Sequence, residues 1–370
     1  MCRTALFLSL VLCSSFAAGQ RLYLNNGVDT IEPGVKAAIH FLQTYLDAFD
    51  TTSNPNYSNY WPEEDCKNLK HPDPIVFAIA GDYPTYRMGS TRTVLYVKPD
   101  TNYIQIKTLF AWTDTQNTVS VLAITNHYIK ADNHAQLKFI SPLKVIGGQW
   151  QTQTVRNVTY TYPSKHVFNK SKADSLVLSI EKLEREWDLK PISIHYYFAD
   201  TKDEIQKLRG FDYSLDMGNR DKPSGISDDQ DNVVFCSGLD ENYFHEVVHI
   251  YLNHLYPKSP LREGLAIFYG GSMGHNLQWH TQRLSAYLQA HTEINLDSLD
   301  KKNYFIYVDN YTNPAGTIRG LICALVYKKS GIEGLKRMMT YTTLEEIFNK
   351  EFGLKRGQWD KFLRDATTSY

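Results

Sequence analysis

Residues 241–271, ENYFHEVVHIYLNHLYPKSPLREGLAIFYGG, constrain the fold of this chain more than any other stretch. His245 and His249 are spaced so that they share one face of a helix, one turn apart. The prolines within 256–260 must end that helix, because proline cannot continue it. Residues 261–269 can then form a second helix that carries Glu263 in its first turns. The stretch therefore predicts two short helices joined by a proline-containing turn.

His245, Glu246 and His249 spell H-E-x-x-H, and two imidazoles on one helix face can reach the same metal ion. Glu246 lies about 100° around the helix from His245, near enough to touch a water on that ion without being a ligand. A catalytic zinc needs three protein ligands and an open position. The second helix puts the carboxylate of Glu263 across from the two histidines, and the small Gly264 would let the helices approach closely.

Histidines further along the first helix are the alternative third ligands. A metzincin-type site needs a glycine and a histidine at positions that hold Leu252 and Leu255 here, so that alternative fails. His254 falls on the opposite helix face from His245, and we expect it to face solvent or the helix end. The third ligand must then be sought beyond Pro257 and Pro260.

The stretch resembles the gluzincins, the thermolysin-like and collagenase-like zinc peptidases, in which H-E-x-x-H is followed by a second helix carrying E-G-[LI]-A. The match falls on His245, Glu246, His249 and on EGLA at 263–266. The resemblance implies one catalytic Zn²⁺ held by His245, His249 and Glu263, with Glu246 as the catalytic base and a peptide or protein as substrate. It covers about residues 165–370, and the G-x-M-E-N signature of the aminopeptidase subgroup is absent.

Other site residues are predicted by position in the chain. Family members commonly stabilise the oxyanion with a downstream Tyr or His, and here Tyr311 is the first choice, with Tyr307 and His275 as alternatives. A short apolar run before the motif is expected to be the edge strand to which a substrate backbone adds, through Val233, Val234 and Phe235. Asp240 is expected to cap the motif helix. Partners for the second nitrogen of the ligand histidines are sought among Asp309, Glu241 and Asp240.

The first residues read as a secretory signal over 1–19, with a positive Arg3, an apolar core and small residues at cleavage spacing. Cys13 leaves a lipoprotein signal as an alternative. We therefore expect a secreted or periplasmic protein without a membrane span. Cys66, Cys236 and Cys323 remain after cleavage, and either two of them pair or all are buried free thiols.

Residues 20–162 begin with an amphipathic helix at 35–49 and continue with strand-like runs at 75–80, 93–98, 103–112, 119–130, 137–145 and 152–162. This predicts an α+β accessory domain, a helix on a curved antiparallel sheet, and the layout resembles the domain of the nuclear-transport-factor-2 type. Residues 163–370 predict a zincin-like peptidase domain, with the motif helix beside a small sheet and a helical C-terminal subdomain. Helices are expected at 172–187, 201–208, 277–291, 315–330 and 343–351, and a strand at 192–198.

The formal charge of the chain is −1, and its lysines and arginines are scattered rather than clustered, so we expect no nucleic-acid partner. Oligomeric state has no signature in the sequence. The alternative to an exported zinc peptidase is a secreted binding protein that uses a peptidase-like scaffold without catalysis.

Overall fold

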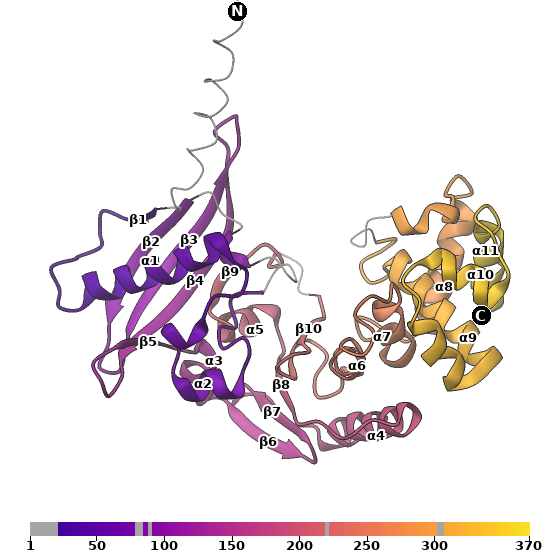
Figure 1. Ribbon diagram of the computed structural model, residues 1–370, viewed down its shortest axis with the longest axis horizontal. Coiled ribbons are helices and arrows are strands. Elements are labelled where there is room, and N and C mark those ends of the chain that lie inside the picture. Colours follow the sequence, from indigo (N-terminus) through magenta and orange to yellow (C-terminus); the bar gives the residue numbers. More distant parts are fainter. Residues whose placement is uncertain (1–20, 78–83, 88–90, 219–221, 302–306) are drawn as a thin grey trace, which may run out of the picture. The chain divides into compact units, whose positions relative to one another are not determined.

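A computed structural model describes residues 21–77, 84–87, 91–218, 222–301 and 307–370 (Figure 1). The fold is mixed α+β, as expected, and it contains two mixed sheets. The chain divides into two compact units, which we call unit 1 (Met1–Gln149 and Gln206–Arg220) and unit 2 (Trp150–Ile205 and Asp221–Tyr370). The expected signal segment lies outside the described residues.

Unit 1 places one long helix, α1 (Val35–Thr51), across the strands of its sheet (Figure 1). The buried face of α1 carries Ala38, Leu42, Leu46 and Phe49, which confirms the amphipathic pattern. The other elements of unit 1 are β1 (Leu22–Leu24), η1 (Tyr57–Asn59), α2 (Glu63–Asn68), η2 (Thr85–Arg87), β2 (Thr91–Pro99), β3 (Ile104–Thr113), β4 (Val119–Ala131), β5 (Leu137–Ile140), α3 (Pro142–Val145), η3 (Gly147–Gln149) and β9 (Phe211–Ser214).

The sheet of unit 1 has the order β1-β2-β3-β4-β5, and β9 also pairs with β4. The expected antiparallel meander is confirmed for β2 to β5. The sheet is nevertheless mixed, because β1 pairs with β2 in parallel. Residues 75–77, expected to begin a strand, form turns, and 142–145 form α3 instead of continuing β5.

Unit 2 contains a second sheet; α4 lies between two of its strands in the chain, and the helices from α6 onward follow it. Its elements are β6 (Gln151–Val155), β7 (Val158–Tyr162), α4 (Lys170–Trp187), β8 (Ile194–Ala199), β10 (Ser224–Asp228), β11 (Val233–Ser237), α6 (Phe244–Leu252), α7 (Arg262–Gly270), α8 (Leu277–Ala290), η4 (Leu296–Lys301), α9 (Pro314–Met339), α10 (Leu344–Phe352) and α11 (Trp359–Ser369). The chain leaves unit 2 within α5 (Lys202–Leu208), where Thr201 Oγ1 accepts from the Glu204 amide, as the expected capping box requires.

The sheet of unit 2 has the order β10-β11-β8-β7-β6. Our expectation that Val233, Val234 and Phe235 form the edge strand is therefore wrong. They lie in β11, which pairs with β8 on one side and with β10 on the other. The edge is β10, a polar strand that the sequence did not lead us to expect.

The division between the units also differs from the boundary expected at about residue 163. Gln151–Val155 and Val158–Tyr162 form a hairpin, and its second strand pairs in parallel with β8, so both strands belong to the sheet of unit 2. In the other direction, residues 211–214 return to unit 1 because β9 pairs with β4. Sheet pairing, rather than order along the chain, decides where each unit ends.

The three described cysteines are free thiols, and Cys236 and Cys323 are buried while Cys66 is partly exposed. Burial raises the pKa of the Cys236 thiol to about 12, which keeps it protonated. Within the described ranges, none of the helices is both long and apolar enough to cross a bilayer.

Candidate metal centre

The helix α6 carries the H-E-x-x-H motif and begins at Phe244, later than expected. Tyr243 is the residue before it and provides no side-chain cap, so Asp240 is not the N-cap. Asp240 instead has a left-handed backbone, forms an ion pair with Lys172, and accepts a hydrogen bond from Tyr196 at its carbonyl. The helix is almost wholly buried, which fixes the two histidine side chains against the core.

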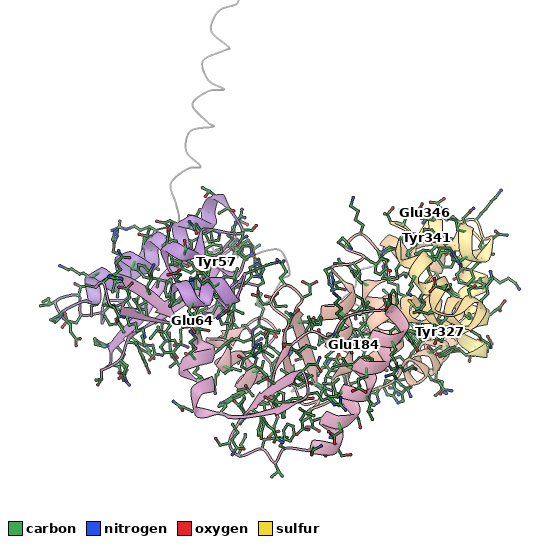
Figure 2. All side chains as sticks on the ribbon, turned by 60° about the horizontal axis from the view of Figure 1, so that its bottom comes forward. Tyr57, Glu64, Glu184, Tyr327, Tyr341 and Glu346 are labelled. Atoms are coloured by element: carbon green, nitrogen blue, oxygen red, sulfur yellow. The ribbon has the colours of Figure 1, made fainter. Side chains whose placement is uncertain are left out.

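The far end of α6 is anchored to α4. The hydroxyl of Tyr251 donates to the Glu184 carboxylate at 2.6 Å and accepts from the Ile192 amide at 3.2 Å. Glu184 is labelled on α4 in Figure 2. Hydrogen bonds at this buried tyrosine hold the helix in one rotation about its axis, so the motif face has a fixed direction.

The helix α7 follows the expected proline-containing turn and carries Glu263 in its first turn. Its close approach to α6 depends on a different glycine from the one we expected. A Cβ at Gly270 would lie 2.3 Å from the His245 backbone nitrogen, whereas a Cβ at Gly264 would meet Arg319 of α9 at 2.5 Å. Gly270 therefore sets the separation of the two motif helices, and Gly264 sets that between α7 and α9.

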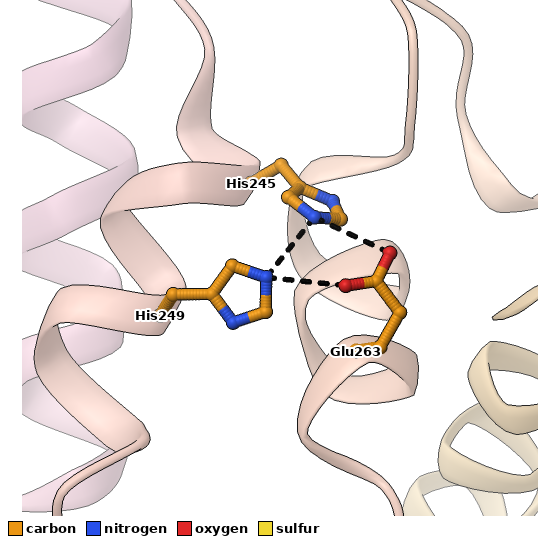
Figure 3. A group of neighbouring side chains, drawn as sticks. All are labelled: His245, His249 and Glu263. Atoms are coloured by element: carbon orange, nitrogen blue, oxygen red, sulfur yellow. Dashed lines mark hydrogen bonds and ion pairs between the residues drawn. The ribbon is translucent and has the colours of Figure 1, made fainter. Parts of the chain in front are cut away.

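His245, His249 and Glu263 come together from these two helices (Figure 3). The two Nε2 atoms are 3.1 Å apart. Glu263 places one carboxylate oxygen 3.5 Å from Nε2 of His245 and the other 3.3 Å from Nε2 of His249. Donors about 2.0–2.1 Å from a tetrahedral ion lie about 3.3–3.4 Å from one another. The measured separations, which involve one nitrogen of each histidine and both oxygens of Glu263, are thus close to those around a single small ion, and three such ligands leave a fourth position open.

The second nitrogen of each histidine is also engaged. Nδ1 of His245 lies 2.6 Å from the carbonyl of Gly271, and Nδ1 of His249 lies 3.2 Å from Oδ1 of Asn253. Both contacts fix the tautomer that leaves Nε2 free for a metal. None of the partners we expected makes these contacts: Glu241 binds His166, Asp240 binds Lys172 and Asp309 binds Arg283.

Gly271 supplies its carbonyl from a conformation that other residues rarely adopt. Its φ is +70°, and a Cβ there would lie 2.0 Å from the His275 carbonyl oxygen. The ring of Tyr243 completes the setting of His245, because it stacks on the imidazole with centroids 5.4 Å apart and planes within 8°. The His245 ring is thereby held on its edge and on one face.

Without a metal, the three groups attract a proton. Burial lowers the pKa of His245, but the negative charge of Glu263 more than compensates and raises it to about 9. Partial burial opposes ionisation of Glu263, but the two imidazoles hold its pKa well below the ordinary value. A metal cation would replace this proton, because imidazole ligates only when neutral at the ligating nitrogen.

Glu246 lies beside the edge strand and is only 5% exposed. Its Oε2 accepts a hydrogen bond of 2.9 Å from the hydroxyl of Ser227 in β10. Room for this carboxylate requires a glycine, because a Cβ at Gly225 would lie 2.8 Å from Cγ of Glu246 and 2.5 Å from the Tyr243 ring. Ser227 and Gly225 were missed by sequence reasoning, since no residue pattern ties them to the motif.

Two hollows open beside His245, His249 and Glu263. The strand-side hollow, of about 500 Å³, is bordered by β10 and contains His245, Glu246 and Glu263. The helix-side hollow, of about 520 Å³, is bordered by the turn between α6 and α7 and shares His249 and Glu263 with the first.

Tyr307 lines both hollows. Tyr307 is 44% exposed, and partial desolvation together with the nearby charge of Glu263 raises the pKa of its phenol, which keeps it a proton donor. Tyr311, our first choice, lines neither hollow and instead packs edge-on against His275, at 5.5 Å between centroids. His275 in turn stacks on Trp279, and His254 is exposed to solvent, as expected.

Comparison of the chain with models of known protein families, with curated protein sequences and with solved structures found no match.

Proposed function

We propose that this chain is an exported zinc-dependent peptidase of the gluzincin type. The observation that carries the proposal is the convergence of His245, His249 and Glu263, whose donor atoms are 3.1–3.5 Å apart and face an open hollow. Two imidazoles and one carboxylate are a ligand set of catalytic rather than structural zinc, which leaves the fourth position for reactants.

The ligand set fits zinc by chemistry as well as by spacing. Nitrogen and carboxylate oxygen suit a borderline-soft divalent cation, and each ligand histidine has a hydrogen-bond partner on its other nitrogen. When bound, zinc would act as a Lewis acid that polarises the scissile carbonyl and promotes ionisation of a water.

Glu246 is the proposed general base. Its carboxylate takes a proton from the attacking water and then delivers that proton to the leaving amine. The hydrogen bond from Ser227 occupies Oε2 and orients the group, which leaves Oε1 available for the proton. Burial beside β10 excludes competing solvent contacts on that side.

Tyr307 is the proposed oxyanion donor, in place of Tyr311. It lines the same hollow as Glu246 and Glu263, and its raised phenol pKa keeps the hydroxyl proton available for donation. Preorganised donors of this kind contribute about 10²–10³-fold to turnover in acyl-transfer enzymes.

The substrate is proposed to be an extended peptide that adds to β10. This strand is the edge of the sheet of unit 2, and Ser224, Gly225, Ile226 and Ser227 all line the strand-side hollow. A backbone placed there forms main-chain hydrogen bonds with the strand and passes beside Glu246. This replaces the substrate contact that we expected for β11.

Export rests on the predicted signal at 1–19, and unit 1 would act as an accessory domain to the peptidase unit. The assignment is tested by loading the wild-type chain and the Glu246→Gln variant with zinc and digesting a peptide library with each. Both should hold one zinc per chain, and only the wild type should cleave. A wild type that takes up no zinc and cleaves no peptide would refute the proposal in favour of a non-catalytic binding protein. Equal cleavage by both chains would refute the proposed mechanism, because Glu246 would then not be the general base.

A further inference from the structure

The charges around the two hollows are unbalanced. Among the residues that the structure describes, the carboxylates lining them are Glu246 and Glu263, both already assigned to the proposed reaction. Their cations are Lys202 and Lys222 in the strand-side hollow and Arg262 in the helix-side hollow. A divalent metal would add further positive charge, so the site as a whole attracts anions.

Lys222 is the cation best placed to contact a substrate. It is half-buried and lies two residues before the start of β10. Its Nζ lies 5.7 Å from the centre of the Tyr307 ring, so the ammonium is held within the hollow. Across the described ranges, no carboxylate lies within ion-pair distance of Lys222. A half-buried ammonium without an anionic partner, at a proposed substrate edge, is a ready site for a carboxylate from outside the chain.

The direction of β10 determines whether Lys222 contacts substrate residues on the N-terminal or on the C-terminal side of the scissile bond. Antiparallel pairing is slightly more stable per residue than parallel pairing, so a bound peptide is expected to run opposite to β10. Its residues on the C-terminal side of the scissile bond then pass Ser224 and reach Lys222. At about 3.3 Å per residue, the step from Gly225 beside Glu246 to Lys222 corresponds to about three substrate residues.

We propose that the site selects peptides carrying an Asp, a Glu or a free terminal carboxylate within about three residues on the C-terminal side of the cleaved bond, read by Lys222. This proposal rests on the proposed peptidase function. It names the substrate class as acidic peptides and Lys222 as a specificity-determining residue.

The test is a zinc-loaded digest of matched synthetic peptides that differ only by Glu or Gln at each position near the cleaved bond. The wild type should favour Glu on the C-terminal side by about fivefold in kcat/KM, the upper range for a partly exposed ion pair. Lys222→Gln should remove the preference and Lys222→Glu should reverse it. Lys258→Gln, an exposed lysine that lines neither hollow, is the matched control and should keep it.

Cleavage without an acidic preference, a preference on the N-terminal side, or a preference that survives Lys222→Glu overturns the inference while the peptidase proposal stands. Failure to cleave any peptide counts against the peptidase proposal alone. In that case the affinity of the zinc-loaded Glu246→Gln chain for the same peptide pairs still tests whether Lys222 selects acidic peptides. Tighter binding of the Glu peptides that is lost in Lys222→Gln/Glu246→Gln supports the inference, and equal binding overturns it.

Discussion

Replacement of Gly270 by alanine should push the two motif helices apart and disable the metal centre. The new Cβ would lie 2.3 Å from the His245 nitrogen and 2.6 Å from its Cα, whereas ordinary contact begins at 3.4 Å. Both neighbours are backbone atoms, so no side chain can turn away, and α6 and α7 must separate by about 1 Å.

This separation has two measurable costs. Overpacking of this kind costs about 1–3 kcal/mol, and the gain from replacing a helical glycine recovers about 1 kcal/mol, so a net loss of up to about 2 kcal/mol is expected. The distances from Glu263 to the two histidines, 3.3 and 3.5 Å, would widen by a similar 1 Å, beyond the tolerance of about 0.2 Å in metal–ligand distances. Zinc affinity should therefore fall by about 100-fold, the upper end of the loss that follows removal of a hydrogen-bond partner of a metal ligand.

Competition for zinc with a chromophoric chelator, together with thermal unfolding, measures both costs. Gly334→Ala is the control, because its Cβ would meet Ser330 within α9 at 2.6 Å and touches neither motif helix. It should lower the unfolding temperature without changing zinc affinity. If Gly270→Ala binds zinc as tightly as the wild type, the close contact between α6 and α7 does not set the site.

Three further outcomes are expected. Asn253→Ala should weaken zinc binding by about 10–100-fold in a chelator competition, because Nδ1 of His249 loses its partner; unchanged affinity would contradict this. Ser227→Ala should lower kcat by about tenfold with little change in KM, because Glu246 loses its orienting hydrogen bond, whereas a change confined to KM would assign Ser227 to substrate binding. In chelator-treated protein, unit 2 should lose stability as pH rises from about 6.5 to about 9. The folded pKa of His245, about 9, exceeds its unfolded value of 6.5, so protonated His245 stabilises the folded state fully below pH 6.5, by on the order of 3 kcal/mol. Hydrogen exchange of the α6 amides, corrected for intrinsic rates, measures the decline. Exchange that shows no loss of protection over this pH range would refute the prediction.

The two motif helices could be predicted from the sequence because the residue patterns that mark them are local. The spacing of His245 and His249, the prolines after α6, and the return of helical periodicity around Glu263 are all properties of adjacent residues. The strands β2, β3 and β4 were predicted for the same reason, since apolar and β-branched runs mark them directly.

The residues around the metal ligands could not be predicted, because their positions depend on contacts between residues far apart in the sequence. Ser224–Asp228 has no apolar alternation and becomes a strand only through its pairing with β11. The partner of His245 is a backbone carbonyl, which every residue possesses, so nothing in the sequence singles out Gly271. Asn253 could have been predicted as a partner of His249, because it is one helical turn beyond His249 and shares its helix face.

Diffraction data collected at the zinc absorption edge, from wild-type crystals grown without chelators, test the central claim most directly. We expect one anomalous peak in unit 2, about 2.0–2.2 Å from Nε2 of His245, from Nε2 of His249 and from a carboxylate oxygen of Glu263. A zinc-loaded crystal with no peak between these three side chains, or with the ion held by other residues, would contradict it.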